Sequence, residues 1–227
     1  MEKKCSKFKR IKINEIFSSI QGEGRFVGQP ALFVRVSGCT RTCPWCDTQY
    51  HREGKWVTTQ KLKQQILDWT CPPYTVVITG GEPLLFKAEL TPLIKYLKKR
   101  TKYTLNFHLE TNGDLIRTSS QLLALLNTFD YVCISPKSIE VAKRLKLYRD
   151  RLLPVIRESH LDIKVVTDLE KVGVDLIEYA TMLMPLTTSS PRKDLVIKRR
   201  VWKFCTYSNL LYSPRIHVDV WRGKRGT

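Results

Sequence analysis

Short apolar, β-branched runs alternate with charged, amphipathic segments along this chain, and this alternation limits the fold more than any other feature. The apolar runs predict strands at 31–37, 75–79, 104–110, 131–135, 162–167 and 216–221. The amphipathic segments predict helices at 59–69, 89–99, 119–127, 139–145, 169–180 and 192–204. Strands that alternate with helices of this length are typical of βαβ units. We therefore predict a single α/β domain over residues 1–227 with a mainly parallel sheet, either barrel-like or doubly wound.

Five predicted strands end in a polar or glycine-rich turn. These turns are 37–39, 79–83, 110–113, 135–137 and 167–168. In parallel α/β folds the carboxyl ends of the strands lie at one edge, where ligands bind. The turns therefore predict one site at one edge of the sheet.

The first of these turns opens a loop with three cysteines in eight residues, Cys39, Cys43 and Cys46. The chain has seven cysteines, an odd number, so a reducing compartment and a metal-type site are favoured over a disulfide framework. A closed zinc site needs four ligands, and His51 would supply the fourth. A four-iron cluster held by three thiolates instead leaves one iron open to a small molecule. The spacing alone leaves both readings open.

The chain is strongly basic, with 39 Lys and Arg against 21 Asp and Glu and a net charge of +18. The basic segments KYLKKRTK and VIKRRVWK are interpreted as solvated helix faces, because aromatic residues are not interleaved as a stacking surface for nucleic acid requires. A hydrophobic content of 42% argues against disorder. The sequence shows no secretory signal and no apolar run of membrane-spanning length, so we expect a cytoplasmic protein with no membrane partner.

Two motifs together resemble the radical S-adenosylmethionine (SAM) superfamily. The cysteine spacing C-x3-C-x2-C, with Trp45 before the last cysteine, resembles the superfamily signature. The turn Gly80-Gly81-Glu82-Pro83 resembles the glycine-rich turn that follows its second strand. The resemblance implies a 4Fe–4S cluster on the three cysteines, with its fourth iron free for SAM.

The segment NEIFSSIQGEGRFVGQPALFVRVSGCTRTCPWCDT closely resembles the 7-carboxy-7-deazaguanine synthase family, and VVITGGEPLL, LETNG, ISPK and IHVDVWRGKRGT continue the resemblance. It implies a partial, shortened (β/α) barrel with six strands, a homodimer, and a flavodoxin or ferredoxin as reductant. The implied enzyme is a carbon–nitrogen lyase of queuosine and archaeosine precursor biosynthesis. It converts 6-carboxy-5,6,7,8-tetrahydropterin to 7-carboxy-7-deazaguanine with loss of ammonia, assisted by Mg²⁺. Hydrogen abstraction at C6 and radical ring contraction carry the reaction, and nucleic acid is not required.

The matching motifs carry the family's site residues over to this chain. The resemblance assigns the cluster to Cys39, Cys43 and Cys46 and the magnesium ion to the hydroxyl of Thr48. It assigns SAM to Trp45, Cys46, Asp47, Gly81, Glu82, Glu110, Ser135, Pro136 and Lys137. It assigns the pterin to Ile20, Gln21, Gly22, Arg35, Thr79, His217 and the C-terminal carboxylate of Thr227.

Several of these residues also have a structural interpretation. Arg35 interrupts an apolar strand, where a buried cation needs an anion: the substrate carboxylate, or an internal partner such as Glu82 or Glu110. Glu82 and Glu110 are equally interpretable as caps of the turns. His217 alternates with apolar neighbours in a predicted strand, so it is either a core histidine or a substrate contact. MLMPL (182–186) carries methionine where the family suggests a more polar residue, which puts substrate contacts there in doubt.

Two other functions compete with this one. A radical SAM activating enzyme, which forms a glycyl radical on a partner protein, shares the cysteine loop and the glycine-rich turn. A non-catalytic zinc module that binds RNA through a basic surface is the alternative from another class. It predicts zinc in place of iron and a steep salt dependence of RNA affinity.

Overall fold

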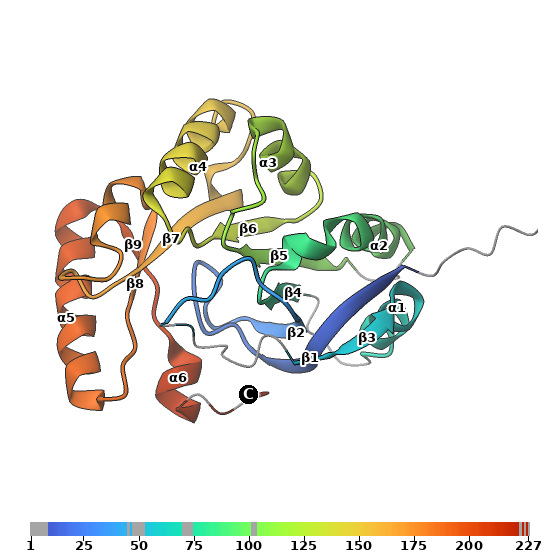
Figure 1. Cartoon of the computed structure of the whole chain (residues 1–227), viewed down its shortest axis with the longest axis horizontal. Helices are drawn as coiled ribbons and strands as arrows, with labels where there is room; N and C mark the ends of the chain where they lie inside the picture. The colour runs from blue at the N-terminus through green and yellow to red at the C-terminus, as the bar shows by residue number, and fades with distance from the viewer. Residues whose placement is uncertain are drawn as a thin grey trace, which may run out of the picture.

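The computed structural model describes residues 9–44, 46, 53–69, 75–100, 104–222, 224 and 226. Within these residues the strands form one sheet in the order β3-β1-β2-β4-β5-β6-β7-β8-β9, with β3 and β9 at its edges (Figure 1). The strands are β1 (Arg10–Ile20), β2 (Pro30–Val36), β3 (Lys55–Thr58), β4 (Thr75–Gly80), β5 (Asn106–Thr111), β6 (Tyr131–Ile134), β7 (Leu161–Thr167), β8 (Met182–Pro185) and β9 (Leu211–Tyr212).

The pairing of the strands confirms the predicted α/β fold with a mainly parallel, incompletely closed sheet. From β2 through β4, β5, β6 and β7 to β8, each strand is parallel to the next. The sheet is extended by the short β9 at one edge. At the other edge β1 pairs antiparallel with β2 and β3. The sequence analysis did not predict β1, β3, β8 or β9.

Helices connect the parallel strands along the outside of the curved sheet (Figure 1). They are α1 (Thr59–Leu67), α2 (Lys87–Arg100), α3 (Ser119–Leu126), α4 (Ile139–Leu152) and α5 (Pro191–Ser208), with the short 3-10 helices η1 (Pro83–Phe86), η2 (Glu158–His160) and η3 (Val174–Tyr179). Thr58, Thr118 and Ser190 begin α1, α3 and α5 by accepting a hydrogen bond from a backbone N–H of the first turn. No described helix is long and apolar enough to cross a membrane.

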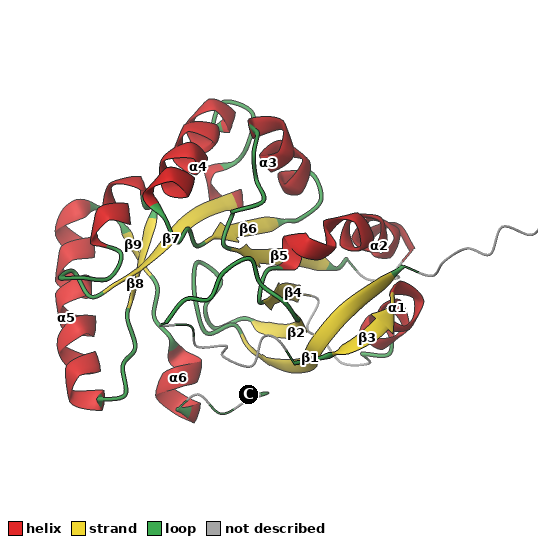
Figure 2. Ribbon diagram, viewed as in Figure 1, coloured by secondary structure: helices red, strands yellow, loops and turns green. Residues whose placement is uncertain are grey.

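The two faces of the sheet have different partners, because successive side chains of a strand point to opposite faces. In β2, Leu32 and Val34 belong to the main core beneath the helices, whereas Phe33 packs on the other face with Val77 and Phe17. The same inner face carries Arg35, one alternate position further along β2. The inner face therefore becomes progressively polar toward the carboxyl ends of the strands, where the loops gather (Figure 2).

Two predicted elements are wrong. Residues 216–221 form the helix α6 (Ile216–Trp221) and not a strand: Asp219 N donates to Arg215 O, and Arg222 N to Val218 O. An alternating run of six residues satisfies its backbone this way when no strand lies beside it. Residues 169–180 do not form one helix, because Gly173 adopts a left-handed conformation (φ 68°) and only η3 follows it.

Candidate functional site

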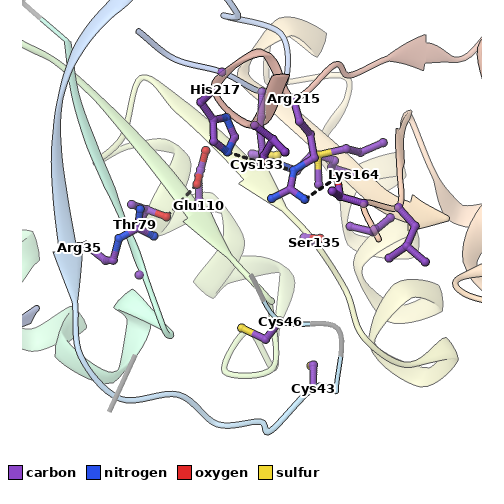
Figure 3. Close-up of a pocket in the computed structure, with 18 of the residues that line it drawn as sticks. Arg35, Cys43, Cys46, Thr79, Glu110, Cys133, Ser135, Lys164, Arg215 and His217 are labelled. Carbon is purple, nitrogen blue, oxygen red and sulfur yellow. Dashed lines mark hydrogen bonds and ion pairs between the residues drawn. The ribbon is translucent and has the colours of Figure 1, made fainter. Parts of the chain in front are cut away.

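The carboxyl ends of the parallel strands surround a cavity of about 1160 Å³ on the inner face of the sheet. It joins the cysteine loop at one end to the segment around α6 at the other. Figure 3 shows Arg35, Thr79 and Glu110 on one side, His217 above Glu110, Arg215 and Lys164 on the other side, and Cys43 and Cys46 below. Eight Lys and Arg residues line the described part of the cavity, against four Asp and Glu, so the site favours an anionic ligand.

The predicted site residues are brought together in large part. Those that line the cavity are Ile20, Gln21, Gly22, Arg35, Cys39, Cys43, Cys46, Thr79, Gly81, Glu110, Ser135, Lys137 and His217. Pro136 lies instead on a smaller neighbouring cavity of about 320 Å³, which Lys137 also lines. Trp45, Asp47, Thr48 and Thr227 lie outside the described residues.

The loop after β2 presents the three cysteines, and its first turn packs directly on the turn after β4. Glu82 N donates to Gly38 O at 2.8 Å. A Cβ atom on Gly81 would lie 1.9 Å from Gly38 O, so no side chain fits between the two turns. This contact fixes the beginning of the cysteine loop against the end of the neighbouring strand.

The three cysteines are not joined in disulfides, and their partly exposed side chains line the cavity. Cys46 N donates to Cys43 O at 3.1 Å, and Asn112 Nδ2 lies 3.8 Å from Cys39 Sγ. Burial raises the pKa of the Cys39 thiol. Among the described residues, no three His, Cys, Asp or Glu side chains form a group able to hold one metal ion. Three cysteine thiols on one loop that faces a large cavity are a ligand set that an iron–sulfur cluster can use.

Glu82 is fully buried and does not line the cavity. Its carboxylate accepts hydrogen bonds from Thr111 Oγ1 (2.6 Å), Asn112 N (2.8 Å) and Leu84 N (2.9 Å). Burial raises the pKa of Glu82, while these three donors favour the ionised form. Of the two interpretations from the sequence, the geometry supports the cap: Glu82 joins the turns after β4 and β5. Its assignment as a SAM contact stays a prediction.

The turn after β5 continues this support toward the cysteines. Asn112 Nδ2 donates to Thr40 Oγ1 at 2.9 Å. Arg41 forms a two-pronged ion pair with Asp114, with N–O distances of 2.7 and 2.8 Å. The cysteine loop is therefore held from a neighbouring strand end on both sides of Cys39.

Glu110 differs from Glu82 because its carboxylate faces the cavity. It accepts from Thr79 Oγ1 at 2.8 Å and from Gln21 Nε2 at 3.2 Å. Both donors are uncharged residues from the predicted pterin set. Lys137 Nζ donates to Ser135 Oγ at 2.9 Å beside this group, so the turn after β6 also presents polar atoms to the cavity.

Arg35 lies on the cavity wall, and its ion-pair partner is Glu15 of β1, with Nε 2.8 Å from Oε1. Its guanidinium also lies 5.7 Å from the centre of the Phe17 ring. The internal partners considered from the sequence, Glu82 and Glu110, are therefore wrong. Glu15 faces Arg35 directly in the antiparallel register of β1 and β2.

The turn at residues 21–24 contacts the segment that leads into α6. Ile216 N donates to Gly22 O at 3.1 Å, and Gly24 N donates to Ser213 Oγ at 2.8 Å. His217 packs on Gly22 so closely that a Cβ atom there would lie 2.1 Å from Nδ1. His217 therefore reaches the cavity from a helix, and the orientation predicted for it in a strand is wrong.

Sequence reasoning missed a buried charge cluster on the same wall, formed by Glu23, Lys164 and Arg215. Glu23 Oε2 lies 2.5 Å from Lys164 Nζ, and Glu23 Oε1 lies 3.0 Å from Arg215 Nε. Burial disfavours the Glu23 carboxylate, but the two cations outweigh it and hold its pKa well below the usual range. The same carboxylate raises the pKa of Lys164 despite burial. The sequence held one sign of this buried cluster: Lys164 interrupts a predicted apolar strand, as Arg35 does in its own strand.

Two further residues line the cavity. Cys133 of β6 is buried at its wall, and burial raises its pKa to about 12. Met184 of β8 also lines the cavity, so the methionine segment supplies an apolar wall at that point.

The comparison with protein families agrees with this geometry. The family model described as the radical SAM superfamily matches residues 33–196, from β2 into α5. The fold and the cysteine site thus define a radical SAM domain. Membership in this superfamily implies a 4Fe–4S cluster and SAM as cofactors.

The similarity to individual proteins narrows the family. The chain is 32% identical to the 7-carboxy-7-deazaguanine synthase of Hyperthermus butylicus, over 92% of each chain. It is 36% identical to that of Haemophilus influenzae, over 69% of this chain and 63% of that protein. The chain belongs to the 7-carboxy-7-deazaguanine synthase family. The crystal structure of QueE from Escherichia coli shares the fold, with a TM-score of 0.54, 22% identity and coverage of 90% of this chain and 93% of that one.

Proposed function

We propose that this enzyme converts 6-carboxy-5,6,7,8-tetrahydropterin to 7-carboxy-7-deazaguanine with loss of ammonia. The proposal is carried by the similarity to the 7-carboxy-7-deazaguanine synthase of Hyperthermus butylicus, which extends over 92% of both chains. The supporting geometry is one cavity that joins the cysteine loop to polar side chains from both ends of the chain. When bound, the reduced cluster and SAM would supply a 5′-deoxyadenosyl radical, which would take a hydrogen atom from C6 and start the ring contraction.

The cysteine end of the cavity would hold the cluster and SAM. Cys39, Cys43 and Cys46 are the thiols available there among the described residues. Gly81 of the turn after β4 lines this end, and Ser135 with Lys137 supplies polar atoms from the turn after β6. These groups would orient SAM beside the cluster, and the protein's contribution is position and electrostatics.

The opposite end of the cavity would hold the pterin. The net positive lining favours its carboxylate, and Arg35 is the cation of this wall that lies nearest Thr79 in the strand register. The Gln21 side chain carries both a donor and an acceptor, which suits the edge of a pterin ring. His217 would close the ring's other side from α6.

The remaining parts of the proposal rest on the resemblance. Mg²⁺ would bind the substrate carboxylate and the hydroxyl of Thr48, since magnesium prefers oxygen ligands. A flavodoxin or ferredoxin would supply the electron, the enzyme would work as a homodimer, and SAM would be regenerated after each turnover. The product would enter 7-deazapurine biosynthesis.

Anaerobic turnover tests the function directly. Reconstituted protein is mixed with the pterin, SAM, dithionite and Mg²⁺, and product is identified by mass. The expected result is 7-carboxy-7-deazaguanine in excess over any SAM consumed, with less product when Mg²⁺ is omitted. A protein that cleaves SAM in the presence of the pterin but leaves the pterin intact would retain the superfamily assignment and overturn the substrate.

A further inference from the structure

Helix α5 (Pro191–Ser208) lies at the edge of the molecule and buries only a narrow side (Figure 1). Of its 18 residues, Val201 and Cys205 are buried. With 100° between successive residues, Arg192, Arg199 and Lys203 fall within about 40° of arc and lie roughly opposite that buried pair. The three side chains are exposed and form one basic line along the helix, which we call the α5 stripe.

The cations of the α5 stripe have no ion-pair or hydrogen-bond partner within the described part of the chain. Other basic residues of the same helix do: Lys198 pairs with Asp219, and Arg200 pairs with Glu170. The sole acidic residue of α5 is Asp194, in its first turn, and its carboxylate accepts from Thr188 N at 2.7 Å. The outward face of the helix is therefore purely positive.

Large apolar and aromatic side chains flank the α5 stripe on both sides. Trp202 is 62% exposed on one side, and Tyr207 is 89% exposed on the other, next to Val196. The Trp202 ring is held by an edge contact with Tyr212, with ring centres 5.1 Å apart. The face thus combines a line of cations with ring faces open to solvent.

Three kinds of partner suit a basic, partly apolar helix, and the order of the side chains distinguishes them. A second copy of this chain, docked symmetrically, would bring the same cations together. A helix that lies on a bilayer buries a central apolar face and keeps its cations at the margins. In α5 the cations are central and the apolar groups are at the margins. A basic track with rings beside it is the arrangement that binds single-stranded nucleic acid.

We propose that the α5 stripe, together with Trp202 and Tyr207, binds single-stranded nucleic acid, as an activity additional to the reaction in the cavity. From Arg192 to Lys203 the helix rises by roughly 16 Å, enough for a few phosphates of an extended strand. The net charge of +18, which a small anionic substrate does not require, draws a polyanion to this surface. None of the three stripe residues and neither ring lines the cavity, so this inference does not depend on the proposed function.

A matched pair of charge reversals in the full-length protein tests the proposal. The first protein carries Arg192→Glu, Arg199→Glu and Lys203→Glu. The second carries Lys95→Glu, Lys99→Glu and Arg100→Glu, three exposed residues of α2, so both have the same net charge. A fluorescent mixed-sequence 12-nucleotide RNA is titrated by anisotropy between 50 and 200 mM salt. The stripe variant is expected to bind at least tenfold more weakly, and the α2 variant within about threefold of the parent.

The salt dependence and the rings give independent measurements. Losing three phosphate contacts is expected to flatten the slope of log K against log salt by about 2. Trp202→Ala and Tyr207→Ala are each expected to weaken RNA binding at least fivefold through lost stacking. Tyr207→Ala keeps the test valid even if the triple variant fails to fold, because this side chain is almost fully exposed.

Four outcomes would overturn the proposal. The first is an equal loss of affinity in the two triple variants. The second is no binding of the parent to RNA at 150 mM salt, and the third is tighter binding of the parent to a duplex of the same length than to the single strand. The fourth is tighter binding to phosphatidylserine vesicles than to RNA, which would assign the face to a membrane. Turnover of the pterin is expected to be unchanged in the stripe variant.

Discussion

Gly22, near the N-terminus in sequence, is in contact with His217, near the C-terminus: a methyl group on Gly22 would lie 2.1 Å from His217 Nδ1. Gly22→Ala is therefore expected to push the imidazole out of the cavity wall and to weaken pterin binding about tenfold. His217→Ala alone is expected to have a similar effect. If both act through the same ring, the double variant will be little worse than either one. The measurement is a double-mutant cycle on KM for the pterin, and additive losses would contradict the shared cause.

The Glu23 carboxylate supports the same wall by pairing with two cations. Glu23→Gln leaves Lys164 and Arg215 buried together without their anion, so we expect a loss of about 3 kcal/mol of stability. We also expect the KM for the pterin to rise while the iron content is unchanged. Urea unfolding and steady-state kinetics measure the two effects.

The control for Glu23 is an exposed ion pair, Lys146 with Asp150 in α4. Lys146→Met is expected to change stability by less than about 0.5 kcal/mol, because exposed pairs contribute little.

Lys164→Arg keeps the charge and should retain more activity than Lys164→Met. Equal losses in the two Lys164 variants would show that the size of the side chain matters there and not its charge.

The sequence was sufficient for the parallel strands β2, β4, β5, β6 and β7, because each is a largely apolar run bounded by a turn, but it missed the parallel strands β8 and β9. It failed where a pattern fits two structures. The alternation in residues 216–221 suits a strand, yet those residues begin α6 against Gly22. The helix predicted at 169–180 is interrupted at Gly173, whose Cβ would lie 2.2 Å from Val166 O. The strand prediction at 216–221 failed because of a contact with a distant segment, Gly22, which a local pattern does not contain. The helix prediction at 169–180 failed because Gly173 lies against Val166, seven residues earlier, in a left-handed conformation that glycine favours.

For the site, too, some features could be predicted from the sequence and others could not. The turns at the strand ends could be placed at one edge from strand order alone, and four of the five, at 37–39, 79–83, 110–113 and 135–137, line the cavity. The partners of buried charges could not be predicted, because they depend on register: Glu15 faces Arg35 only through the pairing of β1 with β2. The basic segment of α5 was dismissed because its aromatic residues are not interleaved in sequence. On the helix, Trp202 and Tyr207 lie beside the cations.

Arg35 distinguishes substrate binding from structural support. If Arg35 binds the substrate carboxylate, Arg35→Ala will raise the KM for the pterin by at least tenfold and leave SAM affinity nearly unchanged. Glu15→Gln removes the Glu15 ion pair but keeps the guanidinium, so it serves as the control. Calorimetric titration of SAM and steady-state kinetics with the pterin give the two affinities. Equal losses in both variants would make the ion pair purely structural.

Cys43 is expected to be essential for the cluster. Cys43→Ala should abolish iron loading, the visible absorbance of the cluster and all SAM cleavage after anaerobic reconstitution. Cys205→Ala is the control. Cys205 lies in α5, is buried in the core cluster with Val165 and Leu183, and does not line the cavity. It should load iron like the parent. Retained iron and SAM cleavage in Cys43→Ala would remove this residue from the ligand set.

His108 gives the fold a measurable pH dependence. Burial lowers its pKa to about 4; Asp130 raises the pKa and Lys98 lowers it, both by less than burial does. Its Nδ1 has no hydrogen-bond partner in the described structure. The neutral ring packs on Phe26 and Tyr131, with ring centres 4.5 and 5.4 Å away. Because the unfolded chain binds a proton near pH 6.5 and the folded chain does not, stability falls as the pH drops from about 6.5 toward 4.

His108→Phe keeps the aromatic packing and removes this titration. Between pH 7 and pH 5 the parent is expected to lose about 2 kcal/mol more stability than the variant. Urea unfolding of both proteins at the two pH values measures the difference, and other titrating groups cancel in the comparison. Parallel losses in the two proteins would mean that His108 takes up its proton in the folded state without cost, through water or a neighbour that compensates the buried charge.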